Sequence, residues 1–217
     1  SKLPSNLKGT RDFLPSELSK RNYIIDNLKK NFQLFGFSQI ETPALEKNAT
    51  LLGKYGSESD RLIFKILNSG EKLKKADIES LQKNNLSSFS DSISEKGLRY
   101  DLTVPLARFV AQHQNDIIFP FKRFQIQNVW RADRPQHGRF QEFTQCDADI
   151  IGSTSSLCEL DLVQVFSEAL DALGVPGYTI LINDRRILAA VALSMGVGAD
   201  RLTDWTVAVD KYDKVGV

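Results

Sequence analysis

The chain has 217 residues, with 28 Lys or Arg against 27 Asp or Glu, and its formal net charge is therefore +1. This near-neutral balance excludes a protein that coats a polyanion by bulk electrostatics, and 41% hydrophobic with 25% charged residues excludes a disordered chain. No run of residues approaches the roughly 18 apolar positions of a membrane helix, so we expect a soluble protein with no membrane partner.

The first half of the chain predicts one long helix, two short strands and a polar excursion. Apolar residues recur at three- and four-residue steps over residues 15–35, which is typical of a packed helix. Residues 37–42, ended by a proline, and residues 62–67 predict strands. Residues 71–94 are rich in Lys, Ser, Asn and Glu, and predict a mobile peripheral excursion with one short helix around residues 77–82.

The second half predicts a helix that begins at Thr103, followed by a long hairpin. Residues 119–133 and 140–152 are rich in β-formers, and the loop between them is basic. Further elements are then predicted as a helix over residues 153–173, a strand over 178–182, a helix over 185–195 and an apolar run at 207–209. Because the hairpin must be antiparallel, the fold class is α+β rather than a doubly wound parallel sheet.

The second hairpin strand places its polar residues on one face. Alternation puts Gln145, Asp147 and Asp149 on the same side as Phe143 and Ile151. Such a face could line a cavity that recognises a cationic amine, or it could be the solvated face of an antiparallel sheet.

Arginines and one further carboxylate add to this region. Arg131, Arg134 and Arg139 surround the hairpin loop, where guanidinium groups could bind a polyphosphate or nucleic acid, or could be solvated. Asp101 lies just before the helix that begins at Thr103, and fits either an amine-binding carboxylate or a turn residue.

The common catalytic signatures are absent. The sequence contains no GxxxxGK[ST], no GxGxxG after a strand, no HExxH and no GxSxG. Cys146 and Cys158 form no CxxC, so we expect no disulfide, no protein metal site and a reducing, cytoplasmic environment.

Three segments in order, residues 8–15 (KGTRDFLP), 98–106 (LRYDLTVPL) and 129–147 (VWRADRPQHGRFQEFTQCD), resemble histidyl-tRNA synthetases. The resemblance implies the class II catalytic fold, an antiparallel sheet flanked by helices that works as a homodimer. Residues 37–43 resemble the first class motif, at the dimer interface. The substrates implied are histidine, ATP with Mg²⁺, and tRNA(His).

The resemblance also implies roles for particular residues. Arg131 would hold the α-phosphate of ATP and the amino-acid carboxylate, and would stabilise charge at the pentavalent phosphorus. The other ATP-binding positions would be Asp133, Arg139 and Phe143, and the histidine-binding positions Asp101, Thr103, Gln145 and Asp149. Asp stands at 101, 133 and 149 where many such enzymes have Glu. Because ATP and histidine must meet above one surface, Arg131 should share a face with Phe143 and Gln145, which requires an even-sum register such as Arg131 opposite Phe143.

The resemblance places the third class motif and the anticodon-binding domain beyond Val217. Residues 1–217 are therefore expected to be the N-terminal portion of the catalytic domain, inactive in tRNA charging when alone. Two other functions are considered: the synthetase-like regulatory subunit of ATP phosphoribosyltransferase, which senses histidine, and a tRNA-sensing pseudo-synthetase. Both fit less well, because Arg131 and Arg139 are retained.

Overall fold

The computed structural model describes residues 3–54 and 60–215, and divides the chain into two compact units, residues 1–176 and 177–217. The first unit contains α1 (Pro15–Leu34), β1 (Ser38–Gln39), β2 (Leu45–Lys47), α2 (Asn48–Leu51), β3 (Lys65–Ile66), η1 (Gly70–Lys75), α4 (Ile78–Gln82), α5 (Leu86–Ile93), β4 (Lys96–Leu98), α6 (Thr103–His113), β5 (Phe121–Trp130), β6 (Glu142–Ile151) and α7 (Leu157–Ala172). The second unit contains α8 (Arg185–Ser194), η2 (Ala199–Arg201) and α9 (Leu202–Val215). The α+β class predicted from the sequence is confirmed.

The β5–β6 hairpin is the centre of the first unit. Its ladder runs from Phe121 opposite Ile151 to Trp130 opposite Glu142, and every pair has an even sum. The predicted parity is confirmed, although the example pairing was wrong by two residues, because Arg131 donates its backbone N–H to the carbonyl of Gln141 at 2.9 Å. β1 adds to β5 in parallel, which makes this a mixed sheet in the order β1-β5-β6.

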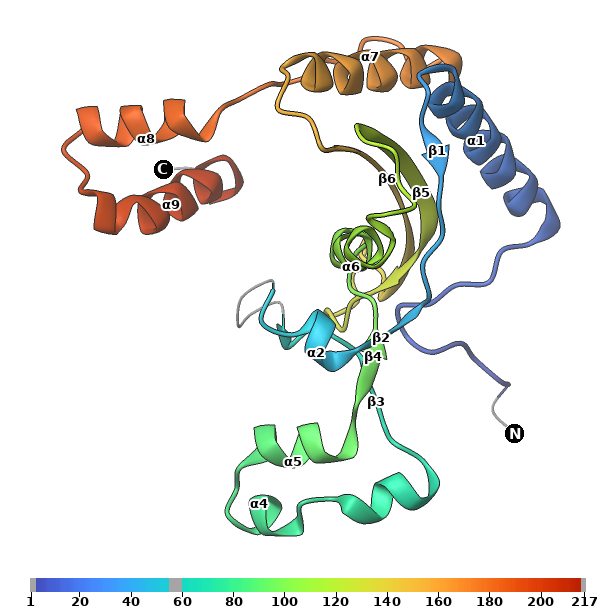
Figure 1. Cartoon of the computed structure of the whole chain (residues 1–217), viewed down its shortest axis with the longest axis vertical. Helices are drawn as coiled ribbons and strands as arrows, with labels where there is room; N and C mark the ends of the chain where they lie inside the picture. Colours follow the sequence, from blue (N-terminus) through green and yellow to red (C-terminus); the bar gives the residue numbers. More distant parts are fainter. Residues whose placement is uncertain (1–2, 55–59, 216–217) are drawn as a thin grey trace. The chain divides into compact units, whose positions relative to one another are not determined.

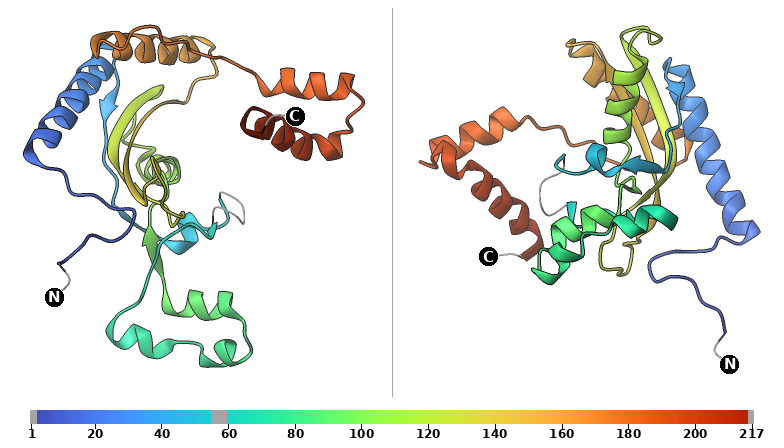
Figure 2. Two further views of the ribbon diagram at one scale, coloured as in Figure 1. Left: turned by 180° about the vertical axis from the view of Figure 1, so that it is seen from behind. Right: turned by 60° about the horizontal axis from the view of Figure 1, so that its bottom comes forward.

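One face of this sheet is the hydrophobic core. Phe124 of β5 is fully buried and stacks on Phe32 of α1, with ring centroids 4.9 Å apart. Phe37 and Val165, the latter from α7, complete the buried cluster. Helices α1 and α7 therefore cover the convex side of the sheet, whereas α6 lies on its concave side (Figures 1 and 2).

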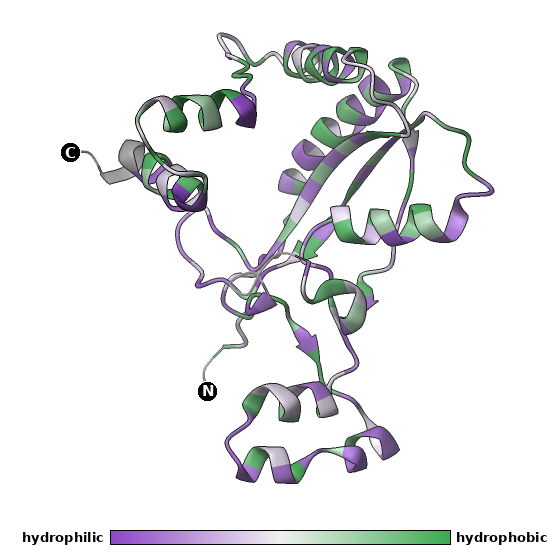
Figure 3. Cartoon of the chain, turned by 60° about the vertical axis from the view of Figure 1, so that its left-hand side comes forward, coloured by the Kyte–Doolittle hydropathy of each residue, from purple (hydrophilic) through white to green (hydrophobic). Residues whose placement is uncertain are grey.

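A second small sheet has the order β2-β4-β3 and leads into residues 70–93. Helix α4 confirms the predicted short helix, whereas η1 and α5 are additional. Asp77 and Asn85 cap α4 and α5 by accepting the backbone N–H of Ser80 and Ser88, which explains why a polar, Ser-rich stretch forms helices. None of the residues in η1, α4 and α5 is buried, and apolar and polar positions are interleaved along them (Figure 3).

The predicted strand at residues 178–182 is wrong. These residues have no regular secondary structure, and Leu181 is 90% exposed. Within the described part of the second unit there is no other strand with which they could pair, so their β propensity is not realised. The apolar run at 207–209 belongs to α9.

Candidate active site

The concave side of the β5–β6 hairpin carries the polar residues. Alternation and register place Arg123 opposite Asp149, Gln125 opposite Asp147, and Gln127 opposite Gln145. We call these six residues the polar face. Because the opposite face is packed against α1 and α7, the polar side chains share the side on which α6 lies (Figure 1).

Arg123 lies at the base of the polar face. Its side chain has no exposed surface, and it forms an ion pair with Asp149, whose side chain is 37% exposed. Burial lowers the pKa of the Arg123 guanidinium, and the carboxylates of Asp149, Asp147 and Asp101 oppose that shift. Among the described residues, Nε and Nη1 of Arg123 have no hydrogen-bond partner. A buried guanidinium therefore stands beside three carboxylates.

Asp147 is half-buried between these charges. Burial raises its pKa; Arg123 opposes this rise, and the neighbouring Asp149 and Asp101 carboxylates add to it. Burial and the two neighbouring carboxylates thus disfavour the charged form of Asp147. A cationic or hydrogen-bond-donating ligand would stabilise that charge and would therefore be favoured beside it.

Hydrogen bonds to Thr42 and Arg99 hold the β5 glutamine side chains of the polar face in place. The amide nitrogen of Gln125 donates to Thr42 Oγ1 at 2.8 Å, and Oε1 of Gln127 accepts from the backbone N–H of Thr42 at 3.1 Å. Arg99, itself buried, also donates to Gln127 Oε1 at 3.1 Å. The side-chain oxygens of Gln125 and Gln145 are buried and have no hydrogen-bond partner among the described residues.

Arg131 follows β5 and lies between two aromatic rings. Its guanidinium carbon is 4.3 Å from the ring centroid of Tyr100 and 5.1 Å from that of Phe143. Its Nε donates to the carbonyl of Tyr100 at 3.2 Å. These contacts fix the charge of Arg131 at the end of the polar face that is nearest the hairpin loop.

Asp101 connects the polar face with α6. Its Oδ1 accepts the backbone N–H of Thr103 at 3.1 Å and of Val104 at 3.2 Å, so it caps the helix. Its charge also acts on Arg123 and Asp147. The two interpretations of Asp101 from the sequence, turn residue and site carboxylate, are therefore compatible.

The remaining predicted residues lie at the margins. Asp133 and Arg139 belong to the hairpin loop, where Arg139 Nε is 3.8 Å from the Asp133 carboxylate. Thr103 is exposed at the start of α6. The structure thus brings together Asp101, Arg131, Phe143, Gln145 and Asp149 on one side of the hairpin, and places Asp133, Arg139 and Thr103 around them.

The N-terminal segment holds the hairpin loop in place. The carbonyl of Gly9 accepts the backbone N–H of Gln141 at 2.8 Å and of Glu142 at 3.3 Å. The guanidinium carbon of Arg11 lies 3.5 Å from the ring centroid of Phe140. The segment at residues 8–15 is therefore a clamp on the loop that carries Arg139.

Sequence reasoning missed Arg123, Gln125 and the role of Asp147. Asp147 was placed on the right face but not chosen as a site residue. Arg123 and Gln125 alternate with Phe124 and Ile126, a period of two that would have identified a polar face on β5 as well.

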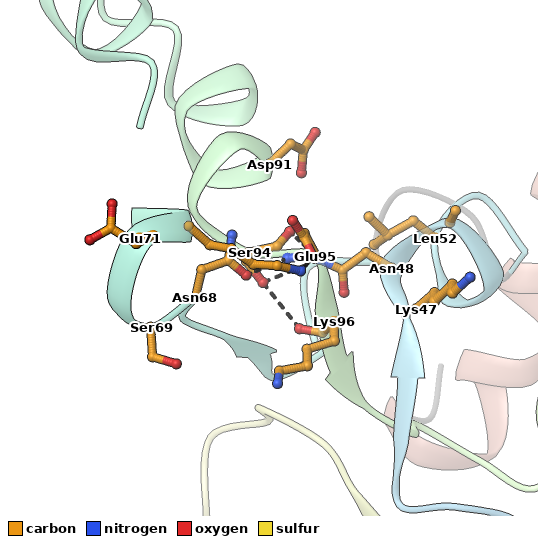
Figure 4. A pocket seen from close by; sticks show the side chains of 12 residues that line it. Lys47, Asn48, Leu52, Asn68, Ser69, Glu71, Asp91, Ser94, Glu95 and Lys96 are labelled. Carbon is orange, nitrogen blue, oxygen red and sulfur yellow. Dashed lines mark hydrogen bonds and ion pairs between the residues drawn. The ribbon is translucent and has the colours of Figure 1, made fainter. Parts of the chain in front are cut away.

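A hollow of about 980 Å³ lies elsewhere, between α2 and residues 68–96 (Figure 4). Its lining contains charges of both signs, and Lys72 is paired with Glu95 at 2.5 Å. None of the residues that the sequence predicted for the site lines this hollow, so we place the candidate site on the polar face instead. Among residues 3–54 and 60–215, no group of three or more His, Cys, Asp or Glu side chains is arranged to hold a metal ion.

Comparisons with known proteins agree with the resemblance. A family described as Histidyl-tRNA synthetase matches residues 71–217. A histidine–tRNA ligase of Christiangramia forsetii is 58% identical over 98% of this chain and 46% of its own length. The histidyl-tRNA synthetase of Nostoc sp. PCC 7120 superposes with a TM-score of 0.75 at 28% identity, over 95% of this chain and 43% of that one.

Another solved structure bears on the regulatory alternative. A Bacillus halodurans protein described as an ATP phosphoribosyltransferase regulatory subunit/histidyl-tRNA synthetase has a TM-score of 0.62 at 25% identity, over 81% of this chain and 39% of that one. It is less similar than the Nostoc enzyme on each of these measures. The fold is that of class II histidyl-tRNA synthetases, and the chain spans about half the length of the curated relatives it matches.

Proposed function

Because this chain belongs to the histidyl-tRNA synthetase family, we propose that it carries the substrate-binding half of a histidine–tRNA ligase site. The reaction would activate histidine with ATP to give histidyl-adenylate and pyrophosphate, and then transfer the histidyl group to tRNA(His). The observation that carries this proposal is the arrangement of Arg131, between Tyr100 and Phe143, at the end of the polar face, whose two carboxylates, Asp147 and Asp149, are joined by the charge of Asp101.

In the first step, a carboxylate oxygen of histidine attacks the α-phosphorus of ATP, and the bond to pyrophosphate breaks. Negative charge develops on the oxygens of the pentavalent phosphorus. Arg131 is held by its aromatic neighbours and by the Tyr100 carbonyl, so its charge is oriented before the reaction begins. Removing one preorganised contact of this kind typically costs about 2.7 to 4 kcal/mol in the transition state.

The nucleotide would lie at the loop end of the site. We assign adenine stacking to Phe143 and the outer phosphates to Arg139, with Asp133 orienting Arg139 through their ion pair. Mg²⁺ would arrive with the triphosphate as part of the substrate.

Histidine would lie along the polar face. Its α-ammonium and imidazole N–H groups are donors, and Asp101, Gln145 and Asp149 supply acceptors, with the Thr103 hydroxyl beside them. Three carboxylates facing two guanidiniums, Arg123 and Arg131, favour a substrate that brings positive charge.

We further propose a homodimer formed through the β1 region, and a cytoplasmic location, since tRNA charging takes place where translation does. In the described parts of the chain, every helix is too short or too polar to cross a membrane.

The test is pyrophosphate exchange with ATP. We define the extended chain as the full-length Christiangramia forsetii relative in which the matching segment, 46% of its length, is replaced by residues 1–217. Histidine-dependent exchange by the extended chain, with no exchange for other amino acids, is expected. Binding of histidine without any exchange would instead favour the regulatory-subunit function. If Asp149→Asn binds histidine and exchanges pyrophosphate as well as the unsubstituted extended chain does, the assigned site is wrong.

A further inference from the structure

Arg123 is the most deeply buried charge of the polar face. Its side chain has no exposed surface, and the next residue, Phe124, is packed into the core on the other side of the sheet. A ligand on the concave side therefore cannot touch Arg123 directly. Any effect of Arg123 on a substrate must pass through the side chains above it.

The charged groups around Arg123 are unevenly balanced. Asp149 is ion-paired with it, and the charges of Asp147 and Asp101 also act on it. Arg131 is the other cation whose charge acts on Asp147.

Helix α6, on the same side, contributes little compensation. Arg108 is bound to Glu46 at 2.6 Å, and His113 lies 3.5 Å from Asp116. Arg123 is thus the principal counterion for the carboxylates of the polar face.

Some of the hydrogen-bond donors of the Arg123 guanidinium are unused. Nε and Nη1 have no hydrogen-bond partner among the described residues. A buried donor without a hydrogen-bond partner destabilises an ordinary core. If Arg123 only filled space, an apolar side chain at position 123 would therefore give a more stable fold. The presence of Arg123 beneath three carboxylates points to an electrostatic task.

We propose that Arg123 is a positioning residue of the amino-acid site: it holds the Asp149 carboxylate in place and compensates Asp147 and Asp101, so that these carboxylates accept from the ammonium and imidazole N–H groups of histidine. The inference rests on the proposed function, and adds a residue that never contacts the substrate. It follows that loss of Arg123 leaves three like charges close together, and one of them takes up a proton as the pH falls.

The experiment compares two variants of the extended chain with a matched control. Arg123→Met removes the charge at similar size, and Arg123→Lys keeps the charge without the planar fork. Lys122→Met is the control, because it removes an ion pair with Asp161 from the neighbouring position of the same strand but on the opposite face. Circular dichroism reports folding, and pyrophosphate exchange gives KM for histidine and for ATP between pH 6.5 and 8.5.

For Arg123→Met, KM for histidine should rise by about 10- to 100-fold, while KM for ATP changes by less than about threefold. The ratio of histidine KM between variant and unsubstituted chain should increase toward pH 6.5. Arg123→Lys should show a smaller rise with a flatter ratio, and Lys122→Met should show neither change.

The proposal is overturned if the histidine KM of Arg123→Met is unchanged, or if both KM values rise together. Should Arg123→Met fail to fold, Arg123→Lys decides, and a histidine KM equal to that of the unsubstituted chain overturns the proposal. Absence of exchange in the unsubstituted extended chain would instead refute the proposed function itself.

Discussion

Replacing Gly9 by alanine tests the clamp between the N-terminal segment and the hairpin loop. Gly9 has a φ of +87°, and a Cβ there would lie 2.8 Å from Cγ of Gln141 and 2.9 Å from Cγ of Pro135. Carbon atoms in contact normally lie about 3.5 to 4.0 Å apart, so the loop must move away. We therefore expect Gly9→Ala to separate the segment from the loop.

The magnitude has two parts. A left-handed conformation costs a non-glycine residue about 1 to 2 kcal/mol, and overpacking adds about 1 to 3 kcal/mol. The matched control is Gly36→Ala, because Gly36 has a similar φ of +77° but nothing within 4 Å of a Cβ. The control therefore carries the conformational cost, at the end of α1, without the collision.

Amide hydrogen exchange at Gln141 and Glu142 is the assay, since both amides donate to the Gly9 carbonyl. A combined loss of about 2 to 5 kcal/mol predicts at least roughly 30-fold faster exchange at these amides in Gly9→Ala. In Gly36→Ala their exchange should be unchanged. Equal exchange rates in the two variants would refute the clamp.

Three further predictions concern nucleotide binding, charge and stability. Phe143→Ala should raise KM for ATP in the extended chain by about 10-fold, because base stacking on an aromatic ring contributes about 1 to 3 kcal/mol. The control Phe143→Tyr keeps the ring and should leave KM for ATP unchanged. Equal ATP KM values for Phe143→Ala and the unsubstituted chain would argue against the stacking role. Because the pKa of Asp147 is raised in the folded state above its ordinary value of 3.8, its proton favours folding, and that stability is lost as the pH rises from 3.8 through the folded pKa. Urea unfolding should therefore show Asp147→Asn gaining stability relative to the unsubstituted chain as the pH rises above 3.8, and a difference that stays constant with pH would count against this. Glu46 is only 5% exposed and accepts from two nitrogens of Arg108, so Glu46→Gln should lower the free energy of unfolding by about 3 kcal/mol. The control is Glu79→Gln, in an exposed ion pair, which should change it by less than about 0.5 kcal/mol in the same urea titration.

Local patterns predicted the parts of the fold in which the pattern and the packing agree. The helix over α1, the start of α6 and the parity of the β5–β6 hairpin follow from periodicities that the core enforces. The strand predicted at residues 37–42 is reduced to Ser38–Gln39, since only these residues pair with β5. Helix α5 was missed because its Ser-rich sequence resembles a loop. The side chain of Asn85 caps its first turn, and this cap stabilises a helix that the composition does not predict.

Half of the polar face could be read from the sequence, and half could not. The alternation of β6 identified Gln145 and Asp149, because polar residues at every second position mark one side of a strand. The alternation of Arg123 and Gln125 with Phe124 and Ile126 was present in the sequence but was not used, and the ion pair of Arg123 depends on the register with β6, which no local pattern gives. The contact of Gly9 with Gln141 joins distant segments, and no local pattern predicts it.

The most direct measurement is a crystal structure of the extended chain with histidine and a non-hydrolysable ATP analogue. Histidine is expected on the concave side of the hairpin, with its nitrogens within hydrogen-bond distance of Gln145 and Asp149, and the α-phosphate at Arg131. Density for histidine on any other surface, or an α-phosphate away from Arg131, would contradict the account.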